Sequence, residues 1–83
     1  MSLQITFYTK PNCPLCEEAE ELLEELKDLF GFSIFKVNII KNMSTYEKYK
    51  NQIPVIDLGG RYYLSGKIDK KELKQKIRAL VKK

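Results

Sequence analysis

The chain has 83 residues, which leaves room for one domain, residues 1–83, with a modest core. Hydrophobic residues make up 43% and charged residues 31%, a balance typical of a folded globular domain, and neither a membrane span nor a secretory signal is recognisable, so we expect a cytoplasmic protein without membrane contact. The net charge is +4, but the basic C-terminal segment has no aromatic residue between Leu64 and Lys83, which favours a solvated helix face over a nucleic-acid site.

The first predicted element is a strand over residues 3–9, in which apolar side chains alternate with more polar ones. Pro11 and Pro14 interrupt this pattern and predict a loop. A helix is predicted over residues 14–30, because Pro14 suits a first helical position and apolar residues then recur at steps of three and four. Gly31 is placed for a left-handed cap at the end of this helix.

A second strand is predicted over residues 32–39. It is apolar at nearly every position, which favours a central place in the sheet. A strand, a crossover helix and a strand in close succession form a βαβ unit, so these two strands should run parallel. Residues 44–47 match a capping box and predict a short helix that carries Tyr46 and Tyr49.

The third strand is predicted over residues 53–58, with Pro54 near its start. Gly59 and Gly60 have free access to positive φ, which predicts a two-residue hairpin turn into a return strand over residues 61–64.

The last predicted element is a helix that begins with a capping pattern at Asp69. Its buried stripe consists of four apolar residues, which are Leu73, Ile77, Leu80 and Val81. The element order is therefore β-α-β-α-β-β-α. This order predicts one α/β domain in which a four-stranded mixed sheet has helices on both faces.

The motif Cys13-Pro14-Leu15-Cys16 lies where the first strand gives way to the first helix. A thiol at a helix start faces unpaired backbone N–H groups and the positive end of the helix dipole, and both favour a thiolate. We therefore expect Cys13 to be the nucleophile and Cys16, one turn further on, to be the buried resolving thiol. Cys13 would attack a substrate disulfide, and Cys16 would release the product by forming an intramolecular disulfide.

Three other interpretations of the cysteine pair stay open. A disulfide across so short a loop would stabilise the fold by only about 2 kcal/mol, and a reducing compartment would keep it open. A zinc site needs four ligands, and the chain has no histidine and no further cysteine, so no metal ligand is assigned. Two core cysteines without chemistry fit poorly at a loop flanked by prolines.

Residues 7–16 closely resemble the active-site segment of dithiol glutaredoxins, and Ile53-Pro54-Val55 resembles a second hallmark of the thioredoxin-fold superfamily. The resemblance spans essentially the whole chain and implies a thioredoxin/glutaredoxin-like fold. It implies that Pro54 is cis and lies against the cysteine pair, and that the backbone of Ile53 pairs with an extended substrate.

The same resemblance implies two roles near the cysteines. Lys10 matches a lysine that contacts a glutathione carboxylate, and Tyr8 matches an aromatic residue beside the active site. A plain surface lysine and simple packing of the tyrosine are the alternatives. After the fourth strand, glutaredoxins carry a Gly-Gly-x-Asp-like turn that grips the other carboxylate, whereas here Gly66 stands alone before Lys67, with Asp69 beyond.

The sequence and the resemblance predict a monomeric disulfide reductase that acts on protein disulfides or glutathione mixed disulfides through Cys13 and Cys16, without a bound cofactor. Its electrons would come from glutathione as co-substrate or from a thioredoxin-reductase-like donor. One alternative is a thioredoxin-fold binding or redox-regulatory module without turnover, and another is a metal-bridged dimer.

Overall fold

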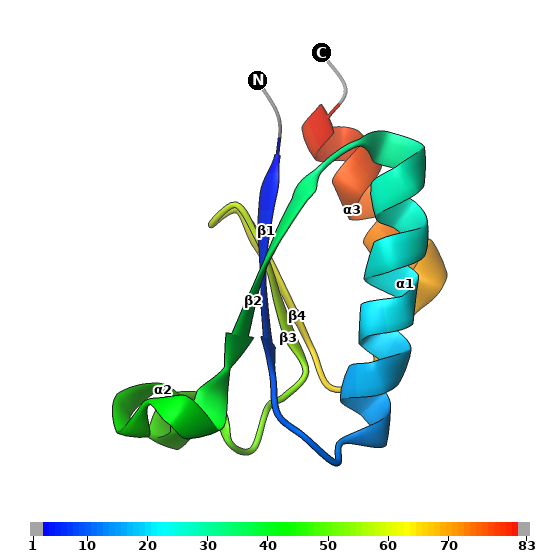
Figure 1. Ribbon diagram of the computed structural model, residues 1–83. Helices are drawn as coiled ribbons and strands as arrows, with labels where there is room; N and C mark the ends of the chain where they lie inside the picture. Colours follow the sequence, from blue (N-terminus) through cyan, green and yellow to red (C-terminus); the bar gives the residue numbers. More distant parts are fainter. Residues whose placement is uncertain (1–2, 82–83) are drawn as a thin grey trace.

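The computed structural model describes residues 3–81 and has the predicted element order (Figure 1). The elements are β1 (Gln4–Thr9), α1 (Pro14–Phe30), β2 (Ser33–Asn38), the 3-10 helix η1 (Ile39–Lys41), α2 (Met43–Tyr49), β3 (Val55–Leu58), β4 (Tyr62–Ser65) and α3 (Lys70–Val81). Within this range no helix is both long and apolar enough to cross a membrane.

The four strands form one mixed sheet in the order β2-β1-β3-β4. β1 and β2 are parallel, as predicted, while β3 runs antiparallel to β1 and β4 antiparallel to β3. The predicted central place of the second strand is wrong, because β3 takes the other side of β1 and leaves β2 at an edge. Only one face of β2 is covered, so Ile34 packs against the core while Phe35 is 57% exposed.

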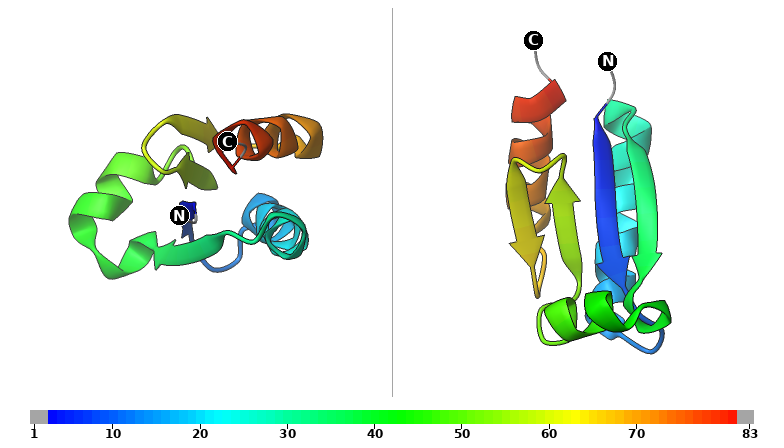
Figure 2. Two further views of the ribbon diagram at one scale, coloured as in Figure 1. Left: turned by 90° about the horizontal axis from the view of Figure 1, so that it is seen from above. Right: turned by 90° about the vertical axis from the view of Figure 1, so that its left-hand side faces the viewer.

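α1 and α3 cover one face of the sheet, and α2 lies on the opposite side at the end where β1 leads into α1 (Figures 1 and 2). The core fills the space between the sheet and the two long helices. Ile5 and Phe7 of β1 are fully buried there, together with Leu23 of α1 and Leu73 of α3. α2 has no buried residue, so it covers one end of the sheet and adds nothing to this core.

The helix ends follow the prediction at α1 and depart from it at α2. Gly31 is left-handed, with φ of 76°, and its N–H donates to the carbonyl of Lys27 at 2.7 Å. At α2 the predicted capping box is wrong by two residues, because the side chain of Asn42, not that of Ser44, accepts from the Thr45 N–H at 3.1 Å. Asparagine is among the strongest N-cap residues, and here it follows directly on η1.

The connection between β3 and β4 is longer than predicted. Leu58 pairs with Tyr62, so three residues separate the strands and the two-residue turn is wrong. Gly59 and Gly60 both have positive φ, 65° and 80°, as their identity suggested. The side chain of Asp57 accepts from the Gly60 N–H at 2.7 Å, which fixes the longer loop.

Candidate active site

The two cysteines lie at the junction of β1 and α1, at the end of the sheet that α2 also approaches (Figure 1). Cys13 is the N-cap of α1 in an extended conformation, and Pro14 occupies the first turn, as predicted. Asn12, just before, has φ of 59°, a left-handed conformation that asparagine adopts more readily than most residues. The local sequence therefore turns the chain from the strand into the helix at Cys13.

The Cys13 thiol takes the place that a serine or aspartate side chain usually has at a helix start. Its Sγ accepts a hydrogen bond from the backbone N–H of Cys16 at 3.2 Å, and its carbonyl accepts from the Glu17 N–H at 3.0 Å. The unpaired N–H groups and the positive end of α1 are thus directed at the sulfur. Both cysteines are free thiols.

Cys16 differs from Cys13 in its surroundings. It is 2% exposed and belongs to the hydrophobic core, whereas Cys13 is only partly buried. Burial raises the pKa of the Cys16 thiol, and the hydrogen bond with Cys13 acts in the same direction. The hydroxyl of Thr9 and the backbone of Lys10 lower this pKa, but the net direction is upward. The outer sulfur is therefore accessible, and the inner one stays protonated to higher pH.

The peptide bond between Ile53 and Pro54 is cis, in agreement with the resemblance, and Pro54 is buried. The N–H of Ile53 already donates to the carbonyl of Tyr49 at 3.2 Å. The Ile53 carbonyl accepts no backbone hydrogen bond from the described part of the chain. Ile53 therefore offers an extended substrate an acceptor, while its donor is occupied.

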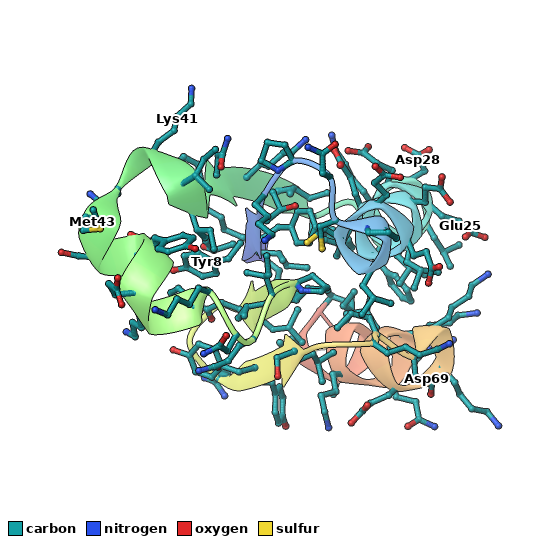
Figure 3. The ribbon with its side chains drawn as sticks, turned by 90° about the horizontal axis from the view of Figure 1, so that it is seen from below. Tyr8, Glu25, Asp28, Lys41, Met43 and Asp69 are labelled. Atoms are coloured by element: carbon teal, nitrogen blue, oxygen red, sulfur yellow. The ribbon has the colours of Figure 1, made fainter. Side chains whose placement is uncertain are left out.

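Tyr8 packs against the short helix. Its ring, labelled beside α2 in Figure 3, stacks on that of Tyr49, with centroids 4.3 Å apart and planes at 26°. Burial raises the pKa of the Tyr8 hydroxyl, helped by its hydrogen bond with Tyr49. This stack ties β1 to α2 and, through the Tyr49 carbonyl, to Ile53.

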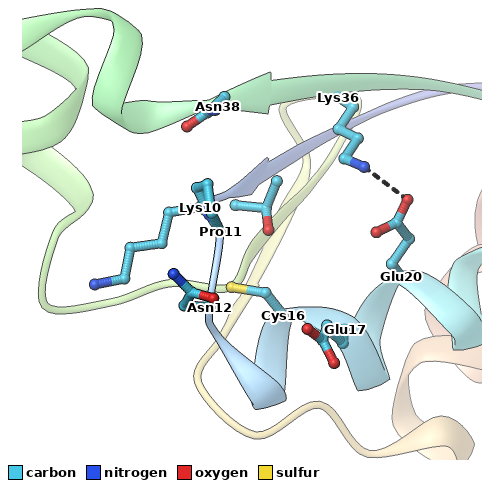
Figure 4. A pocket seen from close by; sticks show the side chains of 9 residues that line it. Lys10, Pro11, Asn12, Cys16, Glu17, Glu20, Lys36 and Asn38 are labelled. Atoms are coloured by element: carbon cyan, nitrogen blue, oxygen red, sulfur yellow. Dashed lines mark hydrogen bonds and ion pairs between the residues drawn. The ribbon is translucent and has the colours of Figure 1, made fainter.

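A cavity of about 240 Å³ opens beside Cys16 (Figure 4). The loop after β1, the first turns of α1 and the edge strand β2 contribute to its walls, and its lining includes Thr9, Lys10, Glu17, Glu20 and Lys36. Lys36 and Glu20 form an ion pair of 2.8 Å there, and the Lys10 side chain points away from the Cys16 sulfur. The sequence patterns did not reveal this cavity. Its one signal is the parallel pairing of β1 with β2, which sets Thr9 beside Asn38.

The turn after β4 contacts the proline loop. Gly66 is left-handed, with φ of 72°, and its N–H donates to the Pro54 carbonyl at 3.0 Å. The Asp69 side chain accepts from the Glu72 N–H at 3.2 Å, which confirms the predicted cap of α3. Asp69 is thus already engaged by its own helix, and Lys67 beside it is exposed.

The structure brings Cys13 and Cys16 together as predicted and links Tyr8 to Ile53 through Tyr49. Lys10 is exposed at the mouth of the cavity. Among residues 3–81, no group of three or more cysteine or acidic side chains is arranged to hold a metal ion.

Comparison with known proteins gives consistent matches. The family described as "Glutaredoxin-like domain (DUF836)" matches residues 4–78. A relative from Dictyostelium discoideum, called glutaredoxin-like protein YDR286C homolog, is 32% identical over 78 residues, which cover 87% of this chain and 72% of the relative.

Two solved structures show the fold. The structural genomics target XcR50 from X. campestris has a TM-score of 0.76 at 24% identity, covering 90% of this chain and 96% of its own. A mutant thioredoxin from Halobacterium salinarum NRC-1 has a TM-score of 0.78 at 18% identity, covering 99% of this chain and 77% of its own. The fold is therefore that of thioredoxin. Because the family match spans nearly the whole sequence, the chain belongs to the glutaredoxin-like domain family.

Proposed function

We propose that the protein is a thiol-disulfide oxidoreductase that reduces disulfides by exchange through Cys13 and Cys16. The observation that carries this proposal is the hydrogen bond of 3.2 Å from the Cys16 N–H to the Cys13 sulfur. It makes the sulfur the cap of α1, where a negative charge is stabilised by the helix. The similarity of the chain to glutaredoxin-like proteins supports the same assignment.

The reaction proceeds in two exchange steps. The Cys13 thiolate attacks one sulfur of the substrate disulfide, the substrate bond breaks, and the other substrate sulfur leaves as a thiolate. Cys16 then loses its proton and attacks the Cys13 sulfur. The bond between Cys13 and the substrate breaks, and the protein is left with an intramolecular disulfide. Two electrons have passed from the protein dithiol to the substrate.

The substrates we propose are protein disulfides and glutathione mixed disulfides. The unpaired carbonyl of Ile53 would accept from the backbone of an extended substrate, and Lys10 would meet a glutathione carboxylate. The lone Gly66 and the engaged Asp69 argue for a weakened grip on the second glutathione carboxylate. Glutathione or a thioredoxin-reductase-like flavoprotein would return the electrons to a monomeric, cytoplasmic protein that holds no cofactor of its own.

The proposal is tested by reduction of insulin and of a glutathione mixed disulfide, with glutathione plus its reductase or with a thioredoxin-reductase system. Cys13→Ser should abolish turnover of both substrates. Cys16→Ser is the matched variant, and it should still form the mixed disulfide with insulin but accumulate it. Turnover by Cys13→Ser at the wild-type rate would overturn the mechanism.

One observation favours the alternative of a binding or redox-regulatory module. The internal hydrogen bond from the Ile53 N–H to Tyr49 leaves only half of the strand-like substrate site available. Alkylation by iodoacetamide at neutral pH separates the two functions. Rapid, selective labelling of Cys13 supports the oxidoreductase, whereas a Cys13 thiol that stays unlabelled supports the module.

A further inference from the structure

We propose that Thr9 is a positioning residue for the resolving step, and that the cavity beside Cys16 is the path by which the Cys16 proton leaves. The proposal rests on the oxidoreductase function above. It concerns the second exchange step alone, so its test can be separated from the test of Cys13.

Thr9 is a polar residue at a buried position. It is the last residue of β1 and, at 7% exposure, the only buried polar side chain among residues 3–81. The alternation of the strand places it on the same face as the fully buried Ile5 and Phe7. A valine would have the same shape and would continue this apolar stripe, so packing alone does not account for the hydroxyl.

The Thr9 side chain and the sulfur that must ionise line the same cavity. The Thr9 hydroxyl acts to lower the pKa of Cys16 against the larger, opposing effect of burial. A hydroxyl that donates to a buried thiolate stabilises the anion, which is the attacking form. Thr9 thus favours the state of Cys16 that the core around it disfavours.

The cavity is the proposed route of the Cys16 proton to solvent. In the mixed disulfide the substrate is attached to Cys13. The Cys16 proton therefore has to leave on a side of Cys16 that faces away from the substrate. A volume of about 240 Å³ is ample for water, and the walls include Glu17 and Glu20 of α1 and Lys36 of β2. The ion pair between Lys36 and Glu20 keeps these two side chains at the wall of the cavity (Figure 4). Water that enters this cavity would connect the buried sulfur to solvent.

The step balances without a further reagent. The Cys16 thiol gives its proton to cavity water, and the thiolate, held by the Thr9 hydroxyl, bonds to the Cys13 sulfur. The bond from Cys13 to the substrate breaks, and its electron pair leaves with the substrate sulfur as a thiolate.

The test uses the reduced full-length chain and 5,5′-dithiobis(2-nitrobenzoate) under single-turnover conditions. This aromatic disulfide releases one coloured thiolate when Cys13 attacks and a second when Cys16 resolves the mixed disulfide. Thr9→Val should leave the first release unchanged and slow the second about tenfold at neutral pH, the size expected when a hydrogen bond to an anion is lost. In Thr9→Val the rate of the second release should also begin to rise at a higher pH than in the wild type.

Two variants control for structure. Thr9→Ser keeps the hydroxyl and should restore the second release and its pH profile. Thr6→Val makes the same change on the same strand but on the opposite face, and it should leave both releases unchanged. If Thr9→Val fails to fold, as judged by circular dichroism, Thr9→Ala takes its place with the same expected slowing.

The outcomes are distinct. A second release that is equally fast in Thr9→Val and Thr6→Val, or that Thr9→Ser fails to restore, overturns the role of Thr9. A first release that is absent in the wild type, or that persists in Cys13→Ser, refutes the proposed function and removes the basis of this inference.

Discussion

The reduced protein should lose stability as the pH rises above the ordinary range of a cysteine, and Cys16 should carry much of that loss. Burial raises the pKa of Cys16 in the folded state above that of the unfolded chain, which is about 8.5. A group whose pKa is raised on folding adds stability that is fully present below the unfolded pKa. This stability is lost as the pH climbs toward the folded pKa, because only the unfolded chain has then released the proton.

The size of the effect follows from proton linkage. Between the unfolded and the folded pKa, the unfolded chain binds one proton fewer at this site, so the free energy of unfolding falls by about 1.4 kcal/mol per pH unit. In a domain of 83 residues each kcal/mol corresponds to roughly 4–8 °C in the melting temperature. The loss over one pH unit is therefore large enough to resolve.

The assay compares urea unfolding of the reduced wild type and of Cys16→Ala at a pH near 7.5 and at one near 9.5. Every other ionisable group is present in both proteins, so the difference between them reports on Cys16. The wild type should lose more stability than the variant over this interval, by at most about 1.4 kcal/mol. Equal losses in the two proteins would refute the reasoning, because they would mean that Cys16 ionises no less readily inside the fold than outside it.

Three further predictions concern stability and are checked by thermal or urea unfolding. Leu23→Ala should cost about 2–5 kcal/mol, because Leu23 is fully buried in the core; a cost under about 1 kcal/mol would contradict the packing described. Asn42→Ala should lower the free energy of unfolding by about 1 kcal/mol, and Ser44→Ala should lower it by under about 0.5 kcal/mol. A larger loss in Ser44→Ala than in Asn42→Ala would support the capping box predicted from the sequence. Lys36→Met should cost under about 1 kcal/mol, since both partners of its ion pair with Glu20 are well exposed, and a larger loss would show that the pair supports the fold.

Local signals in the sequence carried most of the fold. The period of the apolar residues, the proline at the start of α1 and the glycine at its end are properties of neighbouring residues, and each predicted its element correctly. The place of β2 is not a local property. It depends on the side of β1 to which β3 adds, and an apolar run such as that around Phe35 fits an edge strand whose one covered face packs on α1 as well as it fits a central strand.

The candidate site likewise has features that local sequence predicted and features that depend on distant parts of the chain. The spacing of Cys13 and Cys16 at a strand-to-helix junction was enough to place them, because both belong to one turn of one helix. The cavity beside Cys16 requires β2, which is far along the chain, and its existence follows only from the register that sets Lys36 and Asn38 beside β1. The bond from the Ile53 N–H to Tyr49 likewise depends on where α2 ends.

The asymmetry of the cysteine pair follows from the position of α1. One helical turn carries the chain from the surface, where Cys13 meets solvent, into the core, where Cys16 is covered. The N–H groups at the helix start face Cys13 and not Cys16, since the Cys16 N–H points at the other sulfur. In the proposed reaction, a resolving thiol that stays protonated would leave the attack on substrate to Cys13. The lifetime of the mixed disulfide would then be set by how readily Cys16 gives up its proton, and therefore by Thr9 and the walls of the cavity.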